Sequence, residues 1–199
     1  MHFKHGHRFW RGVGVGGVAV MMALPATAAF GQTAVHQDAA HDVIKANRFE
    51  TRLVAAPSNK TADIVRIRFT HTSARAVTTM RLREYGGRWR YTGFIKTPTR
   101  NFVVLGVGHD ARKRFFLLRG IEDPVVVPCD GISSKVDRAK NTLRVSVSTD
   151  CLNHPRWVRM GLLYVVLAPH GAALADDSLG PDLRRFLRRL RVTARLHTN

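Results

Sequence analysis

Acidic side chains are scarce in this chain: 14 Asp and Glu stand against 32 Lys and Arg, and the formal net charge is +18. A charge of this sign and size attracts anionic partners, which include nucleic acids, anionic lipids and acidic cell-envelope polymers. A cationic field also lowers the pKa of a carboxyl group, which opposes its use as a general acid. We therefore expect a binding protein rather than an enzyme.

The familiar catalytic motifs are missing as well. The sequence contains no G-x-S-x-G, H-E-x-x-H, P-loop or C-x-x-C pattern. Glycines within residues 12–17 match the G-x-G-x-x-G spacing of dinucleotide-binding loops, but they follow a basic leader and not a strand. We expect no cofactor and no catalytic residue. An extracellular hydrolase of unrecognised type stays open as an alternative, with a triad assembled from distant positions such as His71, His109, His154 and Asp110.

The apolar run near the N-terminus, GVGVGGVAVMMAL, is shorter than the roughly 20 residues that a membrane-spanning helix needs. Basic residues precede this run, and the small-residue sequence Ala-Thr-Ala follows it at residues 26–28. This order predicts a signal peptide over residues 1–28, cleaved after Ala28, and a secreted, extracellular protein. Removing residues 1–28 leaves a net charge of +15. Because nucleic acid is a rarer partner outside the cell, we expect cell-envelope polymers or anionic membranes instead.

Residues 29–48 lack a sustained hydrophobic period, yet they contain His36, Asp38, His41 and Asp42. Side chains of these types bind divalent metals. In a mobile segment, however, no surrounding residues would hold the imidazole rings in place. We therefore predict a flexible, solvated leader over 29–48 and no metal site.

From residue 49 onward, apolar residues recur with a period of two, as in DIVRIRFT (63–70) and TTMRLRE (78–84). The strand candidates are short, are separated by polar or glycine-containing turns, and have no long helical pattern between them. This organisation predicts an all-β fold over residues 49–170, an antiparallel β-sandwich of Ig-like or jelly-roll-like type. Other expected strands cover 49–55, 88–95, 102–107, 114–119, 131–136, 142–148 and 157–168.

The only two cysteines, Cys129 and Cys151, stand equally far from residue 140. The segments 131–136 and 142–148 are predicted to form a hairpin with its turn near residue 140. Residues equidistant from a hairpin turn face each other. We therefore predict a disulfide between the two cysteines, which the oxidising extracellular compartment favours. In the chain-entropy model, closing a loop of about 23 residues stabilises the fold by about 3 kcal/mol.

Several of these segments together resemble a family of uncharacterised secreted β-sandwich proteins of GC-rich Gram-positive bacteria. The resembling patterns are the A-D-I strand at 62–64, the V-D hairpin that begins at Val136, and C-L-x-x-P-x-W-V-R at 151–159. They cover about residues 60–165. The resemblance implies a sandwich with a cysteine pair, and it implies no activity or catalytic residue.

We predict that residues 63–84 form a hairpin in which Ile67 faces Met80 and Val65 faces Leu82 on the buried side. The same register places Arg66 opposite Arg81 on the outer side, with Arg68 and Arg83 diagonal to them. Like charges directly opposite each other repel, and a bound polyanion would relieve that repulsion. The candidates for binding an anionic or sugar-bearing polymer are these four arginines, Arg66, Arg68, Arg81 and Arg83, together with Trp157.

Trp157 has two interpretations, because it stands between Arg156 and Arg159 and also begins an apolar strand. It either stacks on a ligand or packs in the core, and the core is the commoner place for a tryptophan.

The segment 171–199 is expected to be a basic C-terminal tail that contains a short amphipathic helix from Leu179. Its leucines and phenylalanine fall on one arc and its arginines on the other. Such a helix either docks on the sandwich or lies on an anionic membrane, which makes a membrane-active protein a second alternative function. The membrane-contact candidates are Arg184, Arg185, Phe186, Arg188 and Arg189.

Overall fold

The computed structural model describes residues 31–46, 53–109, 112–168, 171–177, 179 and 191–198. The predicted signal peptide lies outside these residues, and so do residues 180–190 of the predicted C-terminal helix, with all five membrane-contact candidates. In the described part of the chain, no helix has the length and apolar character needed to cross a membrane.

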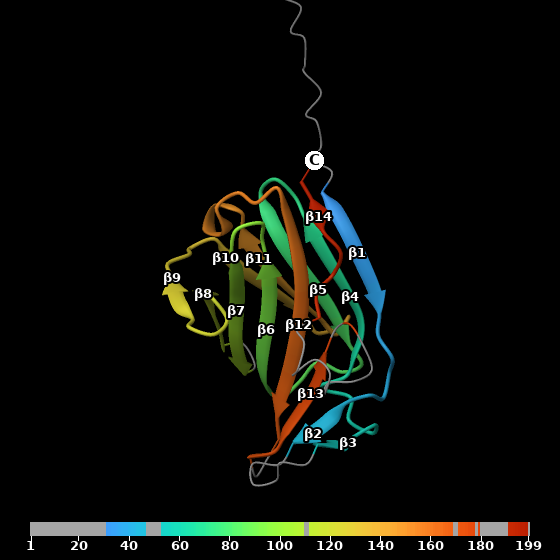
Figure 1. The fold of residues 1–199 in the computed structure, drawn as a ribbon. Helices are drawn as coiled ribbons and strands as arrows, with labels where there is room; N and C mark the ends of the chain where they lie inside the picture. Colours follow the sequence, from blue (N-terminus) through green and yellow to red (C-terminus); the bar gives the residue numbers. More distant parts are fainter. Residues whose placement is uncertain are drawn as a thin grey trace, which may run out of the picture.

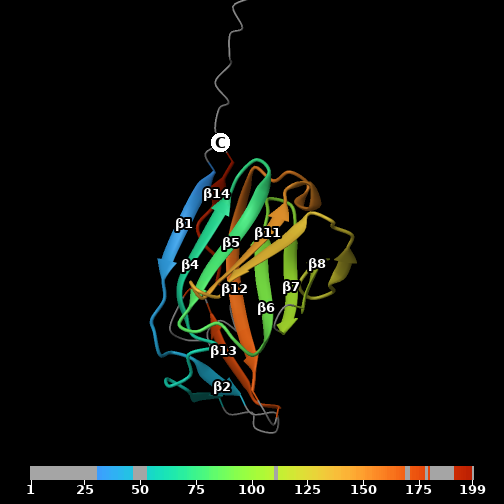
Figure 2. The same cartoon turned by 180° about the vertical axis from the view of Figure 1, so that it is seen from behind.

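Two antiparallel β-sheets pack face to face (Figures 1 and 2), which confirms the all-β class. The five-stranded sheet has the order β1-β4-β5-β11-β10, and the nine-stranded sheet has the order β3-β2-β13-β12-β6-β7-β8-β9, with β14 paired to β12. The strands are β1 Gln32–Gln37, β2 Ile44–Ala46, β3 Leu53–Ala55, β4 Ile64–His71, β5 Arg75–Leu82, β6 Arg88–Lys96, β7 Asn101–His109, β8 Arg112–Arg119, β9 Val125–Val127, β10 Ile132–Asp137, β11 Thr142–Ser148, β12 Trp157–Leu167, β13 Ala173–Asp177 and β14 Leu196–His197.

The core lies between the two sheets and follows from the period-two pattern. Ile67, Met80 and Leu143 of the five-stranded sheet are fully buried, as are Trp89 and Tyr164 of the nine-stranded sheet. Successive side chains of a strand point to opposite faces, so the residues between these apolar positions face solvent. The polar character of the outer faces is therefore a consequence of the same alternation that builds the core.

The β4–β5 hairpin has the expected register over most of its length, with Ile67 opposite Met80. The expected pairing of Val65 with Leu82 is wrong: Ile64 pairs with Leu82, because the register shifts by one residue at a β-bulge. A bulge places two residues of one strand opposite one residue of the other, and period-two patterning does not reveal it. Ile64 is fully buried in consequence, whereas Val65 is only half-buried.

The flanking segments contribute strands, which corrects the expected boundaries. Residues 32–37, placed in a flexible leader by the sequence, form β1 and pair with β4. Residues 173–177 and 196–197, placed in the tail, form β13 and β14 and pair with β12. The sequence did not predict these strands. The β1 strand lies at the edge of its sheet and has no fully buried residue, so its alternation is weak. The β13 and β14 strands are only 5 and 2 residues long.

The predicted disulfide between Cys129 and Cys151 is confirmed, with the two Cα atoms 5.7 Å apart. The β10 and β11 strands form the expected hairpin, in which Ile132 pairs with Val147. Cys151 lies just beyond β11, in the short 3-10 helix Asp150–Leu152. The bond therefore closes the open end of the hairpin.

We predict that Cys151→Ser lowers the free energy of unfolding by about 2 to 5 kcal/mol, because the unfolded chain regains the entropy that the bond removes. Urea denaturation of the wild type and of the Cys151→Ser variant measures this difference. Alkylation of the unreduced wild type, followed by intact-mass measurement, provides the control. Two alkylated thiols in unreduced protein would contradict the disulfide.

Candidate functional site: a basic groove on the five-stranded sheet

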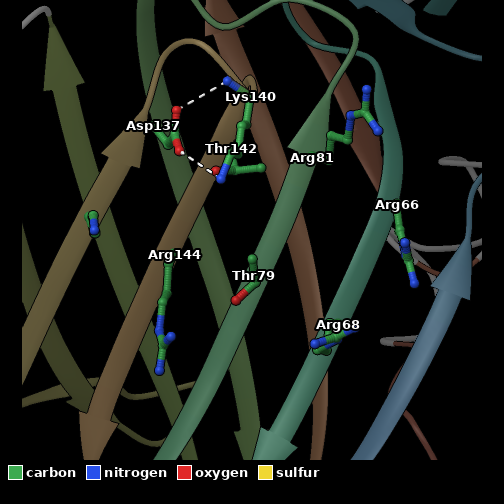
Figure 3. A pocket seen from close by; sticks show the side chains of 9 residues that line it. Arg66, Arg68, Thr79, Arg81, Asp137, Lys140, Thr142 and Arg144 are labelled. Carbon is green, nitrogen blue, oxygen red and sulfur yellow. Dashed lines mark hydrogen bonds and ion pairs between the residues drawn. The ribbon is translucent and has the colours of Figure 1, made fainter.

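The outer face of the five-stranded sheet contains a groove of about 400 Å³, which we call the basic groove (Figure 3). Its walls come from β4, β5, β10 and β11 and from the turn between β10 and β11. Its lining residues are Arg66, Arg68, Thr79, Arg81, Lys135, Asp137, Lys140, Thr142 and Arg144.

Strand register arranges these side chains in two rows that run across the sheet. In the first row, Arg66 of β4 stands directly opposite Arg81 of β5, as the sequence predicted. The row continues from Arg81 to Thr142 of β11 and from Thr142 to Asp137 of β10. The two arginines are both exposed, so the groove contains a like-charged cross-strand pair, which is an unfavourable arrangement.

The second row lies two residues further along each strand. It runs from Arg68 of β4 to Thr79 of β5, then to Arg144 of β11 and Lys135 of β10. Figure 3 shows Arg68, Thr79 and Arg144 side by side on three neighbouring strands. Since adjacent strands lie about 4.8 Å apart, cations from both rows can reach one ligand.

The groove carries six cationic side chains and one acidic side chain. The acid, Asp137, pairs with Lys140 at 3.8 Å and accepts a hydrogen bond from its backbone N–H at 3.1 Å (Figure 3). Within the described residues, the other five cations, Arg66, Arg68, Arg81, Lys135 and Arg144, form no ion pair. The groove is therefore strongly positive, and most of its charge is available to a ligand.

A second hollow of about 480 Å³ continues the basic groove toward the other end of the hairpin, sharing Lys135 and Arg144 with it. Arg75 closes this end, where its guanidinium donates to the Ser146 hydroxyl and, at 2.8 Å, to the Gly131 carbonyl. These bonds fix the Arg75 side chain against the sheet, whereas five of the six cations of the basic groove form no ion pair within the described residues.

Arg83, the fourth arginine candidate, lies outside the basic groove. Strand β5 ends at Leu82, so the alternation that places Arg81 on the outer face does not extend to residue 83. The Arg83 guanidinium lies 3.1 Å from the buried carboxylate of Asp63 and donates to the Asn59 carbonyl at 3.2 Å. Its side chain is 16% exposed. Its role is therefore to pair with a buried acid.

Trp157 also lies away from the groove. It begins β12 in the other sheet and pairs with His197 of β14. The ring is half-buried, and the guanidinium carbon of Arg195 lies 4.6 Å from its centroid. That contact is a cation–π interaction within the chain, so the ring does not serve the groove.

The sequence reasoning missed a second basic hollow, of about 620 Å³, on the nine-stranded sheet. Alternation in β6 and β8 places exposed Arg88, Arg90, Arg112 and Arg114 there. The same spacing of basic residues is visible in RWRY (88–91) and RKRF (112–115). Nothing in the sequence shows, however, that the strands containing them both pair with β7 and so lie on either side of it.

Of the three histidines considered for a triad, His109 ends β7 opposite Arg112 and lines the hollow on the nine-stranded sheet. His71 is fully buried, its Nδ1 lies 2.9 Å from the Leu196 carbonyl, and burial lowers its pKa. His154 lies 3.3 Å from Asp150, whose other oxygen accepts a hydrogen bond from Ser148 at 3.0 Å. General-base activation requires the histidine between the acid and the serine, whereas here the acid is in the middle. Asp110 lies outside the described residues.

We predict that Arg81→Gln raises the free energy of unfolding by about 0.2 to 1 kcal/mol at low salt, because it removes repulsion from Arg66. The gain should shrink in 0.5 M salt, which screens exposed charges. Thermal denaturation at both salt concentrations measures it. Arg90→Gln is the matched control, since Arg90 faces Val107 and Val165. An equal gain in both variants would show that net charge, not the pair, is responsible.

Comparison with known proteins yields no relative for this chain. No family model, no curated protein sequence and no solved structure matches it. The function of the basic groove is therefore inferred from its own residues, their register and their charge.

Proposed function

We propose that this protein is an exported, non-catalytic binding module that holds an anionic cell-envelope polymer in the basic groove. The observation that carries the proposal is the set of five unpaired cations that strand register gathers in one groove. An anionic polymer laid across the two rows would reach several of these cations at once. It would also release the counterions that the polymer and the groove hold separately.

The chemistry of the groove favours an anionic group over a sugar ring or a base. None of its described lining residues is aromatic, and recognition of single-stranded nucleic acid relies on aromatic stacking. Arginine instead binds phosphate and carboxylate through two parallel N–H groups. We therefore place phosphate-bearing or carboxylate-bearing polymers ahead of neutral polysaccharides and of nucleic acid.

Export supports a cell-envelope partner. The N-terminal sequence has the order of a secretory signal, and the disulfide is of the kind that persists in oxidising compartments. The same features agree with the secreted sandwich proteins of GC-rich Gram-positive bacteria that the sequence resembles. An exported protein with this charge would meet teichoic acids and acidic polysaccharides at high local concentration.

We predict that substituting Arg66, Arg68, Arg81 and Arg144 together by Gln weakens binding to lipoteichoic acid on the order of 100-fold at 50 mM salt. Each lost contact should also reduce the slope of log K against log salt by about one. Calorimetric titrations at three salt concentrations give both quantities.

The matched control substitutes Arg88, Arg90, Arg112 and Arg114 by Gln, which removes the same charge from the other sheet. This variant should bind within a few fold of the wild type. If both four-fold variants lose the same affinity and slope, binding follows net charge and the basic groove is not the site. If neither variant loses affinity, the proposal fails.

A further inference from the structure

Five of the 14 acidic residues gather where the chain crosses from one sheet to the other. Asp38 and Asp42 lie between β1 of the five-stranded sheet and β2 of the nine-stranded sheet. Asp63 directly precedes β4, and Asp176 and Asp177 end β13. We call these five residues the acidic cluster. In a chain with a net charge of +18, a local excess of acids needs a physical explanation.

Several carboxylates of the acidic cluster are held in place by backbone N–H groups. Ala39 donates to Asp38 at 3.1 Å, His41 donates to Asp63 at 3.0 Å, and Ile64 donates to Asp176 at 2.7 Å. Oxygens of Asp38, Asp42 and Asp176 all lie within 4.8 Å of one another. The carboxylates of Asp38, Asp63 and Asp176 are therefore oriented before any ligand arrives.

Several oxygens of the cluster are buried and accept no hydrogen bond. The side chain of Asp38 is 1% exposed and that of Asp63 is 0% exposed. In each, one oxygen accepts a backbone hydrogen bond, whereas the second is buried without a partner. Both oxygens of Asp42 are also buried and unpartnered. Burying a carboxylate oxygen without a partner is costly, and a bound cation removes that cost.

Two basic side chains among the described residues lie against carboxylates of the cluster. Arg83 forms an ion pair with Asp63 at 3.1 Å, and the His36 imidazole lies 3.9 Å from Asp38. Among the described residues, Asp42 and Asp176 form no ion pair.

We propose that the acidic cluster is a calcium site, with Asp38, Asp42 and Asp176 as ligands and the unpartnered oxygen of Asp63 beside them. Carboxylate oxygens are the ligands that hard divalent cations prefer. Calcium–oxygen distances of about 2.3 to 2.6 Å place opposite ligands about 4.6 to 5.2 Å apart, which the spacing of these oxygens allows. Magnesium requires a tighter octahedron and keeps more of its waters.

Calcium in this position would join the two sheets. Asp38 follows β1 of the five-stranded sheet, whereas Asp176 belongs to β13 of the nine-stranded sheet. An ion between them stabilises the folded state by mass action. Its binding does not depend on the basic groove, whose lining residues are different.

The test uses the full chain stripped of metal with a chelator. We expect calorimetry to show one calcium site with a Kd on the order of 10⁻⁴ M or tighter, as in extracellular calcium modules. Calcium at about 100 times Kd should raise Tm by about 5 to 10 °C. Absence of both signals would overturn the proposal, and an equal response to magnesium would overturn the assignment to calcium.

The variants separate ion binding from folding. Asp42→Asn should remove the calcium-dependent rise in Tm while leaving the metal-free protein as stable as the wild type or more stable, because it relieves repulsion between carboxylates. Asp38→Asn should act in the same way if it folds. Asp137→Asn is the matched control, since Asp137 lies outside the cluster and should leave the calcium response unchanged. A full calcium response in Asp42→Asn would contradict the site.

Discussion

The antiparallel pairing of β4 with β5 is the constraint on which both the core and the basic groove depend. The register that places Ile67 against Met80 inside necessarily places Arg66 against Arg81 outside. A shift by one residue would exchange the two faces and bury the arginines. Burial of the apolar side chains therefore determines on which face the arginines lie. The free energy gained by that burial is larger than the repulsion between Arg66 and Arg81, so it fixes the register.

Local patterning was sufficient to predict the central strands, the β4–β5 register near its middle and the disulfide. These features depend on alternation and on distances along the chain, which a sequence displays directly. The bulge at Val65, the edge strand β1 and the strands β13 and β14 were not predictable in the same way. Each depends on a partner that is distant in sequence, and a short strand shows little alternation of its own.

The candidate site was predicted in part for the same reason. Arg66, Arg68 and Arg81 belong to one local hairpin, so sequence reasoning placed them on one face. Lys135 and Arg144 come from the β10–β11 hairpin, which joins the groove only through pairing of β11 with β5. Arg83 does not line the groove: β5 ends at Leu82, where the backbone N–H groups of Leu82 and Arg83 donate to the carbonyls of Asn141 and Asp63.

Those contacts bring the two charged regions of the molecule close together. Asn141, in the turn beside Lys140 and Thr142 of the basic groove, accepts a hydrogen bond from Leu82 through its carbonyl and donates to the Arg83 carbonyl at 3.1 Å. The Arg83 side chain then pairs with Asp63 of the acidic cluster. Because an αL conformation is required at Asn141, where φ is 52°, asparagine suits both the turn and these bonds. One short series of contacts thus links the turn of the basic groove to the acidic cluster. The turn that lines the basic groove and the ion pair of the acidic cluster therefore share one segment of backbone, Leu82 and Arg83.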